Sequence, residues 1–467
     1  MVVGAGPVGE NAADRARKAG LTVAIVEKHL VGGECSFYAC SPSKALLRPI
    51  HATRASQRVQ GSEDARIDPQ GVLARRDVWV NRVGTSDTLD DGGQVDWLDH
   101  VGITLLRGVA RLVGERLLEV DGRTIRARQA VVVATGTAPS VPPIPGLREA
   151  KPWTNREATT SRRIPDRLAV LGGGVVACEL AQVFAALGSK VTIVEMTDGL
   201  LGRTEPFAGK AVEEALERDG VEVLLGTKAE SVSRLGPTGE VTLELSGGRS
   251  ITADELLVAV GRTPATQGLG VEEVGGRLDD AGYVSVNERM EVKGLAGDVP
   301  WLYAVGDVNG IALLTHMGKY QARACGELIG ARAAGRQPDR GATTPWADDL
   351  GAPQVVFTDP EVAAAGLTEQ QARDRGIRVR VVDLPMDSAA GAGLQAEGYQ
   401  GQARIVVDED AGALVGATFV GQDVAEMVHA ATVAIVGKVP LTTLWHAVPS
   451  YPTMSEIWLR LLEEYGL

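Results

Sequence analysis

The chain has 467 residues, of which 44% are hydrophobic and 23% charged, and its formal net charge is −13 at pH 7. This composition is typical of a soluble globular protein, and the length predicts about three domains. The negative charge argues against a general surface for nucleic acid or anionic membranes. The longest apolar stretch, residues 168–188, contains Glu179 and three consecutive glycines, so we expect no membrane span.

Four cysteines occur in the chain, and of these only Cys35 and Cys40 are close in sequence. So few cysteines do not make a secreted disulfide scaffold, and the six scattered histidines predict no structural metal site. A close cysteine pair in a reducing compartment is more often catalytic or redox-sensing than structural. We therefore expect a cytoplasmic protein with a redox-active pair. The alternative is two ordinary core cysteines.

Residues 1–27 predict a strand, a glycine turn, a helix over 11–19 and a second strand over 21–26 that is closed by Glu27. The turn holds Gly4, Gly6 and Gly9. In such a unit the first glycine allows the tight turn, the second admits a pyrophosphate, and the third lets the helix touch the strand. The terminal acid binds a ribose. The first strand is short, so we expect further residues before Met1.

The same pattern returns after the proline-rich boundary at 142–146, with a strand over 168–171 and a helix over 179–187. Its turn holds Gly172, Gly174 and Ala177, and its second strand, 191–194, is closed by Glu195. Glu195 follows Gly172 by 23 positions, as Glu27 follows Gly4. Thr135 and Gly136 after the strand 130–133 have a counterpart in Gly261. This is an internal repeat of a dinucleotide-binding domain.

The acid of the second unit indicates which nucleotide binds there. Glu195 should repel a 2′-phosphate and bind a 2′-hydroxyl, so NADH is favoured over NADPH. Arg203, which lies downstream, would weaken that preference.

Short strands with turns at Gly108, Gly114 and Gly122 are predicted within residues 101–128. A strand over 301–305 ends in Gly306 and Asp307, and a helix over 315–331 leads to a linker at 335–341. Beyond the linker, four strands and two helices predict a third, α+β domain; they cover 354–357, 377–383, 403–407, 414–420, 424–436 and 454–464.

Together these motifs resemble the FAD-dependent pyridine nucleotide–disulfide oxidoreductases, the group of dihydrolipoamide dehydrogenase, glutathione reductase, mercuric reductase and soluble transhydrogenase. The resemblance covers essentially the whole chain and rests on residues 4–9, 33–44, 134–136, 172–179, 306–307, 353–361 and 451–456. It implies an α/β fold with two Rossmann-like domains, for FAD and NAD(P)H, and a C-terminal α+β dimerisation domain. The implied division is 1–146 and 271–342 for FAD, 147–270 for NAD(P), and 343–467 for dimerisation.

The resemblance also implies roles for individual residues. Cys35 would be the interchange thiol that meets substrate, and Cys40 the thiolate that forms a charge-transfer pair with the flavin. Lys44 and Glu179 match a pair near the flavin N5, although without the resemblance a solvated surface pair is an equal interpretation. A helix N-terminus and Lys44 would lower the thiol pKa. The implied cofactor contacts are Gly4, Gly6, Gly9, Glu27, Lys44, Thr135, Gly136, Gly306 and Asp307 for FAD, and Gly172, Gly174, Glu195 and Gly261 for the nucleotide.

The C-terminal motif departs from the family pattern. Tyr451 stands where dihydrolipoamide dehydrogenase and glutathione reductase have an acid–base histidine, and Glu456 matches the glutamate that orients it. A tyrosine with a pKa near ~10 is a poor base at neutral pH but can donate a proton. His446 is at a position that the family does not use as the base, so we expect a packed or surface histidine.

The departures leave the substrate open. Tyrosine at this position is similar to soluble transhydrogenase, which lacks the second cysteine that this chain keeps as Cys40. Mercuric reductase also uses a tyrosine in this region, but its C-terminal cysteine pair has no counterpart here. Phe37 and Tyr38 replace the usual small residues between the cysteines and would narrow the space around the disulfide. His316 starts the helix after the flavin motif, where it could approach the isoalloxazine or equally be structural, and Cys178 is expected to be a small packed residue.

We therefore expect a homodimer whose C-terminal segment completes the partner's active site, and which moves electrons between NAD(P)H and a thiol or disulfide substrate. An alternative is transfer from flavin to a quinone, dye, oxygen or NADP without the disulfide. Another is a flavoprotein whose cysteines regulate or scaffold a complex.

Overall fold

The computed structural model describes residues 1–84, 86–297 and 299–467. Residue contacts divide the chain into two compact units. Unit 1 contains residues 1–42, 77–140 and 262–348, and unit 2 contains 43–76, 141–261 and 349–467. Three helices include residues of both units: α3 (Cys40–Gln57), α4 (Pro69–Trp79) and η2 (Trp346–Leu350). The predicted domain boundaries at residues 146, 270 and 342 stay a prediction.

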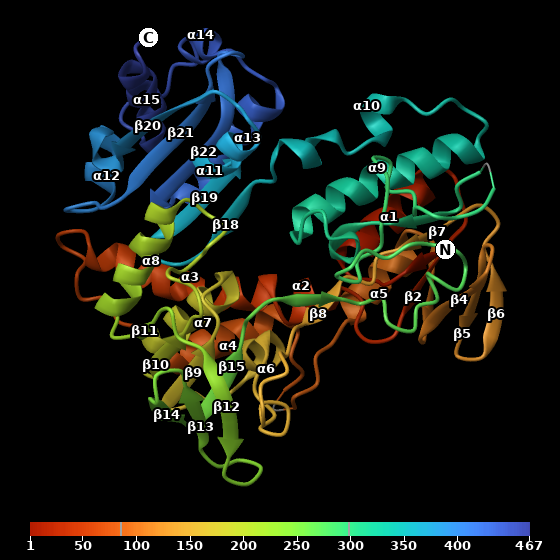
Figure 1. The fold of residues 1–467 in the computed structure, drawn as a ribbon, viewed down its shortest axis with the longest axis horizontal. Helices are drawn as coiled ribbons and strands as arrows, with labels where there is room; N and C mark the ends of the chain where they lie inside the picture. Colours follow the sequence, from red (N-terminus) through yellow and green to blue (C-terminus); the bar gives the residue numbers. More distant parts are fainter. Residues whose placement is uncertain (85, 298) are drawn as a thin grey trace. The chain divides into compact units, whose positions relative to one another are not determined.

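Unit 1 is built on a parallel sheet of five strands in the order β17-β7-β1-β2-β3. Figure 1 labels β2 and β7 of this sheet. The strands are β1 (Val2–Val3), β2 (Val23–Glu27), β3 (Ile103–Arg107), β7 (Val131–Val133) and β17 (Leu302–Ala304). An antiparallel group contains β4 (Ala110–Gly114), β5 (Leu117–Val120) and β6 (Arg123–Arg126), and β8 (Thr137–Pro139) pairs with β16 (Arg262–Pro264). The helices are α1 (Pro7–Lys18), α2 (Gly33–Phe37), α5 (Gly92–His100), η1 (Gly306–Asn309), α9 (Thr315–Ala333) and α10 (Arg340–Thr343).

Helices α1 and α9 lie side by side in unit 1 (Figure 1). Their close approach depends on glycines of α9. A Cβ atom at Gly326 would lie 2.5 Å from the Cβ of Arg15, and one at Gly330 would lie 2.4 Å from the Cβ of Ala19. Small residues at such a contact let the helices pack closely, so α9 is fixed against the glycine-turn helix α1.

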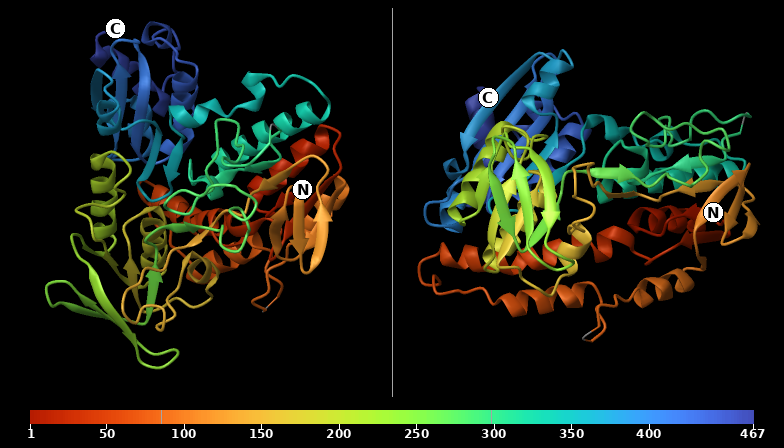
Figure 2. Two further views of the ribbon diagram at one scale, coloured as in Figure 1. Left: turned by 45° about the vertical axis from the view of Figure 1, so that its right-hand side comes forward. Right: turned by 60° about the horizontal axis from the view of Figure 1, so that its bottom comes forward.

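Unit 2 contains a parallel sheet in the order β11-β10-β9-β15. Its strands are β9 (Arg167–Leu171), β10 (Lys190–Val194), β11 (Glu222–Leu224) and β15 (Glu255–Val258). Strands β12 (Ala229–Arg234), β13 (Val241–Leu245) and β14 (Ser250–Ala253) form a separate antiparallel ribbon (Figure 2). The helices of this part are α6 (Asn155–Thr160), α7 (Val175–Ala186) and α8 (Pro206–Arg218).

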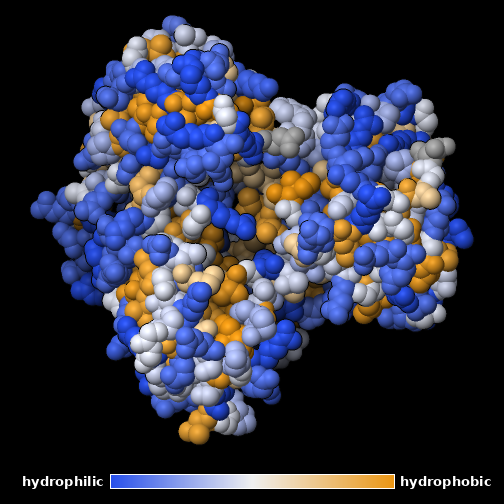
Figure 3. Space-filling view, in the orientation of Figure 1, coloured by the Kyte–Doolittle hydropathy of each residue, from blue (hydrophilic) through white to orange (hydrophobic). Residues whose placement is uncertain are grey.

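The C-terminal part of unit 2 is an antiparallel sheet in the order β18-β19-β22-β21-β20. It comprises β18 (Gln354–Val356), β19 (Glu361–Gly366), β20 (Val379–Pro385), β21 (Gln402–Asp408) and β22 (Ala413–Gly421). The helices are α11 (Glu369–Asp374), η3 (Met386–Ser388), α12 (Ala390–Gln395), η4 (Val424–Met427), α13 (Val428–Val436), α14 (Leu441–Leu444), η5 (Met454–Glu456) and α15 (Ile457–Tyr465). Figure 3 shows apolar side chains gathered among hydrophilic ones over this part of the molecule.

The predicted α/β fold is confirmed, and the differences are local. Helices α1 and α7 begin at Pro7 and Val175, four residues earlier than predicted, because the third small residue of each turn already lies in the first helical turn. Strand β19 was missed because its sequence, Glu-Val-Ala-Ala-Ala-Gly, is buried on most positions and lacks alternation. Within the described ranges, no helix is long and apolar enough to cross a membrane.

Candidate functional site

Cys35 and Cys40 lie in unit 1 on consecutive helices, Cys35 within α2 and Cys40 at the start of α3. The segment begins at Gly32 and Gly33, which have φ values of +102° and +56°. A Cβ atom at Gly33 would lie 2.9 Å from the Cα of Gly6, so the cysteine segment starts directly against the first nucleotide turn. Only glycine combines this left-handed backbone with this close approach.

The two sulfurs share a hydrogen-bonding partner, Thr315, at the start of α9. Its Oγ1 lies 3.4 Å from Cys40 Sγ and donates to Cys35 Sγ over 3.4 Å. Cys35 is also hydrogen-bonded to Cys40, and both are thiols in this structure. The predicted cysteine pair is therefore brought together, and Thr315 is a partner that the sequence did not reveal. A hydroxyl residue at a helix start was the available signal.

The expectation of a low thiol pKa is wrong for Cys35 in the reduced pair. The hydrogen bond with Cys40 and then burial raise the pKa of Cys35, while Thr315 and the charge of Lys319 lower it in part. The reduced pair therefore resists the loss of its second proton, because a neighbouring sulfur and a low-dielectric site both disfavour a second negative charge. The nearby cation is Lys319 on α9, which sequence reasoning missed.

Lys44 is engaged elsewhere, in an ion pair of unit 2. Its Nζ lies 2.7 Å from Oε2 and 3.0 Å from Oε1 of Glu179, whose side chain is 3% exposed. The backbone N–H of Phe357 donates to the same carboxylate over 3.0 Å, and the Phe357 ring centroid is 4.8 Å from Nζ. The buried carboxylate of Glu179 thus has two donors, while Lys44 is 34% exposed, so a fully solvated surface pair does not describe this contact.

The first glycine turn fits a dinucleotide pyrophosphate. A Cβ atom added to Gly4 (φ +97°) would lie 2.5 Å from the carbonyl oxygen of Ala134. A Cβ atom added to Gly9 would lie 1.9 Å from the carbonyl oxygen of Gly4. At Gly6, the residue before α1, it would meet nothing within 4 Å. Packing therefore requires the first and third glycines, whereas the second faces open space at a helix N-terminus, where unpaired N–H groups attract anions.

Polar groups for the remainder of FAD lie in the same unit. Glu27 ends β2, and its Oε2 and Oε1 accept from the backbone N–H groups of Ala5 and His29 at 2.8 and 2.7 Å. Asp307 Oδ2 accepts from Thr137 Oγ1 at 3.0 Å, and burial raises the pKa of Asp307. Gly136 (φ +68°) faces open space, whereas Thr135 donates to Ala265 O and Gly306 packs on Val8. A largely enclosed carboxyl group suits the hydroxyls of a polyol chain.

The second glycine turn repeats this geometry in unit 2. A Cβ atom at Gly172 (φ +112°) would lie 2.5 Å from Ala259 O, the same distance as in the first turn. Gly174 and Gly261 face open space. Glu195 Oε1 accepts from the N–H and hydroxyl of Thr197 at 2.7 and 2.8 Å. Arg203 is exposed, and Cys178 is buried with its thiol donating to Gly173 O.

In the C-terminal motif, the side chain of Tyr451 is exposed. Tyr451 is 78% exposed, whereas Glu456 is buried and accepts from Ala390 N at 3.2 Å and from Arg460 at 2.7 Å. Within the described part of the chain, no hydrogen bond joins Tyr451 to Glu456. His446 and His316 are exposed. Gly391 of α12 supports this segment, since a Cβ atom there would lie 2.1 Å from the carbonyl carbon of Thr453.

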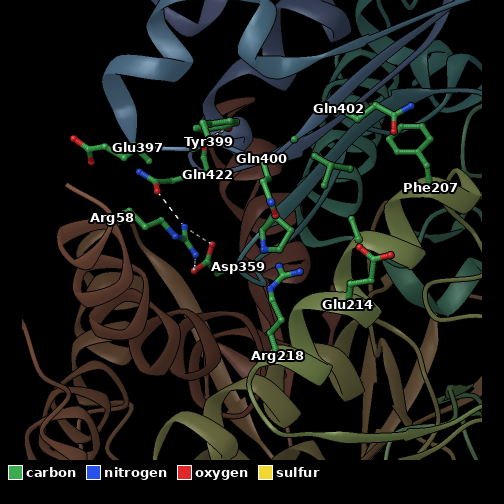
Figure 4. Close-up of a pocket in the computed structure, with 16 residues that line it drawn as sticks. Arg58, Phe207, Glu214, Arg218, Asp359, Glu397, Tyr399, Gln400, Gln402 and Gln422 are labelled. Atoms are coloured by element: carbon green, nitrogen blue, oxygen red, sulfur yellow. Dashed lines mark hydrogen bonds and ion pairs between the residues drawn. The ribbon is translucent and has the colours of Figure 1, made fainter. Parts of the chain in front are cut away.

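Two cavities lie outside these residues. A cavity of about 350 Å³ in unit 2 is lined by Arg58, which directly follows α3, by residues of α8 and by the segment 396–402, among them Arg218 and Tyr399 (Figure 4). Another, of about 430 Å³ in unit 1, is lined by Glu10, Asn11, Asn81, Gly93, Gln94 and Trp97. Burial raises the pKa of Glu10 to about 7. Across residues 1–84, 86–297 and 299–467, no group of three or more His, Cys, Asp or Glu side chains could hold a metal ion.

The two open glycines give a paired prediction. Gly6→Ala should fold normally but lose FAD at least ~10-fold more readily, because the new methyl group occupies the space expected for the pyrophosphate. Gly174→Ala should keep its FAD and instead raise KM for the pyridine nucleotide. The measurements are FAD content after gel filtration and steady-state kinetics. Normal FAD retention in Gly6→Ala, or FAD loss in Gly174→Ala, would contradict the assignment of the two turns.

Comparison with known proteins agrees with this geometry. Residues 1–322 match the family model described as pyridine nucleotide-disulphide oxidoreductase, and residues 352–461 match the dimerisation domain of that family. The chain is 35% identical over 461 residues to a dihydrolipoyl dehydrogenase of Thermus scotoductus, covering 98% of this chain and 95% of that protein. It is 29% identical to a mercuric reductase of Staphylococcus aureus, covering 98% of this chain and 80% of that protein.

Solved structures give the same result. The HOCl-induced flavoprotein disulfide reductase RclA from Escherichia coli superposes with a TM-score of 0.82 at 25% identity, covering 99% of this chain and 98% of that chain. The family implies binding of FAD and a pyridine nucleotide, and the first glycine turn with Glu27 and Asp307 fits FAD. The chain therefore belongs to the pyridine nucleotide–disulfide oxidoreductase family and is an FAD-dependent NAD(P)H:disulfide oxidoreductase.

Proposed function

We propose that this enzyme reduces a small disulfide, or oxidises the matching dithiol, with NAD as the preferred nucleotide and Cys35–Cys40 as the electron relay. The observation that carries the proposal is the placement of the two sulfurs. They are hydrogen-bonded to each other and to Thr315, in the unit that also holds Glu27 and Asp307. This arrangement differs from two unrelated core cysteines, which would not share a polar partner.

The first glycine turn, Glu27 and Asp307 would hold FAD, which would supply the hydride acceptor for NADH and the two-electron donor for the Cys35–Cys40 disulfide. Reduction breaks the S–S bond and leaves two sulfurs that together hold one proton and one negative charge. We assign that proton to Cys35, whose pKa is raised by its hydrogen bond with Cys40 and by burial. Thr315 and the charge of Lys319 oppose this rise in part, so they stabilise the negative charge that forms on Cys35 when it gives up its proton.

The thiol pair then passes its electrons to the substrate disulfide. Cys35 Sγ attacks one sulfur of the substrate, which breaks the substrate S–S bond, forms a mixed disulfide and releases the other substrate sulfur as a thiolate. That thiolate takes up a proton, and the proton that leaves Cys35 replaces it. Cys40 then attacks Cys35 Sγ, which restores the internal disulfide and releases the second substrate thiolate, and that thiolate takes up a proton from solvent. Two electrons and two protons thus reach the substrate.

The first departing thiolate needs a proton donor, and Tyr451 is the candidate. Its hydroxyl stays protonated at neutral pH because its ordinary pKa is near ~10. The dimerisation domain supports a homodimer. We propose that Tyr451 of the partner subunit completes each active site, since the side chain is 78% exposed in the single chain. Glu456 holds the segment through Ala390 and Arg460.

The proposed preference for NADH rests on Glu195. Its carboxylate is oriented by Thr197 at the end of β10 and packs against the second glycine turn, since a Cβ atom at Gly173 would lie 2.9 Å from its Cγ. A carboxylate there favours a ribose 2′-hydroxyl and repels a 2′-phosphate. A cytoplasmic location is part of the proposal, in keeping with four cysteines that are all free thiols.

A second candidate is electron transfer from flavin to a non-disulfide acceptor, as in a transhydrogenase. Tyr451 favours it because an enzyme that does not move thiol protons needs no titratable base at this position. Absence of turnover on any acceptor would favour a regulatory flavoprotein.

An anaerobic titration with NADH separates the first two candidates. In the wild-type enzyme, the first equivalent of NADH should produce a long-wavelength thiolate–flavin band before full reduction. In Cys35→Ser the oxidised enzyme has no disulfide to reduce, so NADH should give reduced flavin directly. Disulfide turnover should fall at least ~1000-fold, because the attacking thiolate is gone. Identical titrations of the two proteins, with turnover retained, would exclude the relay.

Nucleotide choice gives a further prediction. We expect kcat/KM for NADH to exceed that for NADPH by about 10- to 100-fold, the range expected from a charge-assisted hydrogen bond. Glu195→Gln should reduce this ratio mainly by weakening NADH binding. Arg203→Gln should change the ratio in the opposite direction and raise it, because it removes a positive charge that would favour a 2′-phosphate. The assignment fails if NADPH is the better donor in wild type.

The shared active site is testable by mixing two inactive subunits. Tyr451→Phe should lower disulfide turnover about 10- to 100-fold, as expected for loss of a general acid, and leave flavin reduction by NADH unchanged. A heterodimer of Cys35→Ser and Tyr451→Phe subunits contains one site with both changes and one site with neither. It should recover about half of the wild-type activity if the sites are shared. No recovery would place Cys35 and its Tyr451 in one subunit, and a larger loss in His446→Gln would assign the proton donor to His446.

A further inference from the structure

Phe357 is held at three points in unit 2. Its backbone N–H donates to Glu179 Oε1 at 3.0 Å, its carbonyl oxygen lies 3.1 Å from His51 Nε2, and its ring faces Lys44 Nζ at 4.8 Å from the centroid. Phe357 directly follows β18, while Lys44 and His51 are on α3 and Glu179 is on α7. The peptide group before Phe357 contacts Glu179 and the peptide group after it contacts His51, so Phe357 connects His51 to the Lys44–Glu179 pair.

His51 is suited to hold a carbonyl group. A carbonyl oxygen can only accept, so Nε2 must carry a proton, which fixes the tautomer of the neutral ring. Burial is the main cause that lowers the pKa of His51, followed by the charges of Arg54 and Arg48, against the opposing effect of Asp359. The ring is thus held as a neutral donor. Its Nδ1 lies 3.9 Å from Oε1 of Glu361.

Burial also raises the pKa of Glu361, to about 7, so this neighbour does not impose a full negative charge on His51 at neutral pH. The other Glu361 oxygen, Oε2, accepts from Ala425 N at 2.9 Å, which fixes the carboxyl group in place.

Asp359, two residues after Phe357, is held by hydrogen bonds of its own. Asp359 accepts two bonds from Arg58, at 2.9 and 2.6 Å, and Arg58 also donates to Gln422 (Figure 4). The backbone of Asp359 exchanges two further bonds with the side chain of Gln182 on α7, at 2.7 and 3.1 Å. These bonds hold residue 359 independently of His51. Among the described residues, His51 is the one side-chain donor to the carbonyl oxygen of Phe357.

We propose that His51 is a positioning residue for the Lys44–Glu179 pair. By holding the carbonyl of Phe357, it fixes the orientation of the N–H that binds Glu179 and of the ring that faces Lys44. Without the bond, rotation of the chain at Phe357 weakens one of the three donor contacts of a buried carboxylate. The effect of His51 on catalysis rests on the proposed function, in which Lys44 and Glu179 act near the flavin. The effect of His51 on the hydrogen bond from Phe357 to Glu179 does not depend on that function.

Two substitutions on α3 separate the hydrogen bond from the shape of the side chain. Gln places an amide donor where His51 has Nε2, whereas Leu fills the space without a donor, and both residues favour helices. Val241→Ala is the control for lost packing, because Val241 is fully buried in the β12–β14 ribbon and its core cluster includes neither Phe357 nor His51. All variants are prepared as FAD-loaded protein.

The first measurement is hydrogen exchange of the Phe357 amide in the holoenzyme. We expect about 5- to 10-fold faster exchange in His51→Leu, a change that corresponds to the loss of about one hydrogen bond. His51→Gln should stay near wild type, and Val241→Ala should leave this amide unchanged. Equal exchange in His51→Leu and wild type overturns the inference whatever the kinetics show.

The second measurement is the rate of flavin reduction by NADH in anaerobic stopped flow. His51→Leu should slow it about 5- to 10-fold and His51→Gln should restore most of the rate. In a Glu179→Gln background, His51→Leu should add little further loss, because the two residues act through one contact. Additive losses overturn the inference. A wild-type rate in Glu179→Gln would instead refute the catalytic role of the pair, while the exchange experiment still decides the positioning role.

Discussion

The close approach of a glycine turn to a neighbouring strand end is the constraint on which both nucleotide units depend. At Gly4 and Gly172 the backbone has a positive φ, and in each case a Cβ atom would lie 2.5 Å from the carbonyl oxygen that ends the neighbouring strand, Ala134 or Ala259. Any larger residue would separate the helix from the sheet and move the helix N-terminus. The same N-terminus must supply the free N–H groups, so packing and anion binding are fixed by one contact.

The first unit extends this constraint to the redox pair. Gly33 approaches the Cα of Gly6, which ties the start of the cysteine segment to the turn itself. Thr315 on α9 bonds both sulfurs, and α9 packs on α1 through Gly326 and Gly330. The positions of the two sulfurs therefore depend on α1, the helix that begins at the first glycine turn. In unit 2 the carboxylate of Glu179 is buried by a different route, with Lys44 and Phe357 as donors, because a buried charge is tolerated only when its hydrogen bonds are satisfied.

The sequence was sufficient to predict the fold and to name most residues of the candidate site, whose roles stay predictions, because glycine spacing, terminal acids and the cysteine pair are local patterns. Glu27, Asp307 and the Cys35–Cys40 pair lie where the motifs placed them along their strands and helices. Thr315, Lys319 and His51 could not be assigned this way. Their contacts join residues that are far apart in the sequence. His51 and Phe357 are 306 residues apart, and Cys35 and Thr315 are 280 residues apart. Strand β19 was missed for a different reason, because burial on both faces removes the alternation that marks a strand.

The protonation state of Cys35 connects the unusual tyrosine to the rest of the proposed cycle. A thiol whose pKa is raised by its partner sulfur keeps its proton after reduction, so the pair holds one proton of its own. A base that titrates near neutral pH is then needed mainly for dithiol oxidation, where protons must leave two substrate thiols. Disulfide reduction instead needs a group that remains protonated, which a tyrosine is. In the proposed cycle, Tyr451 with a protonated Cys35 would suit the direction in which NADH is consumed and a disulfide is reduced.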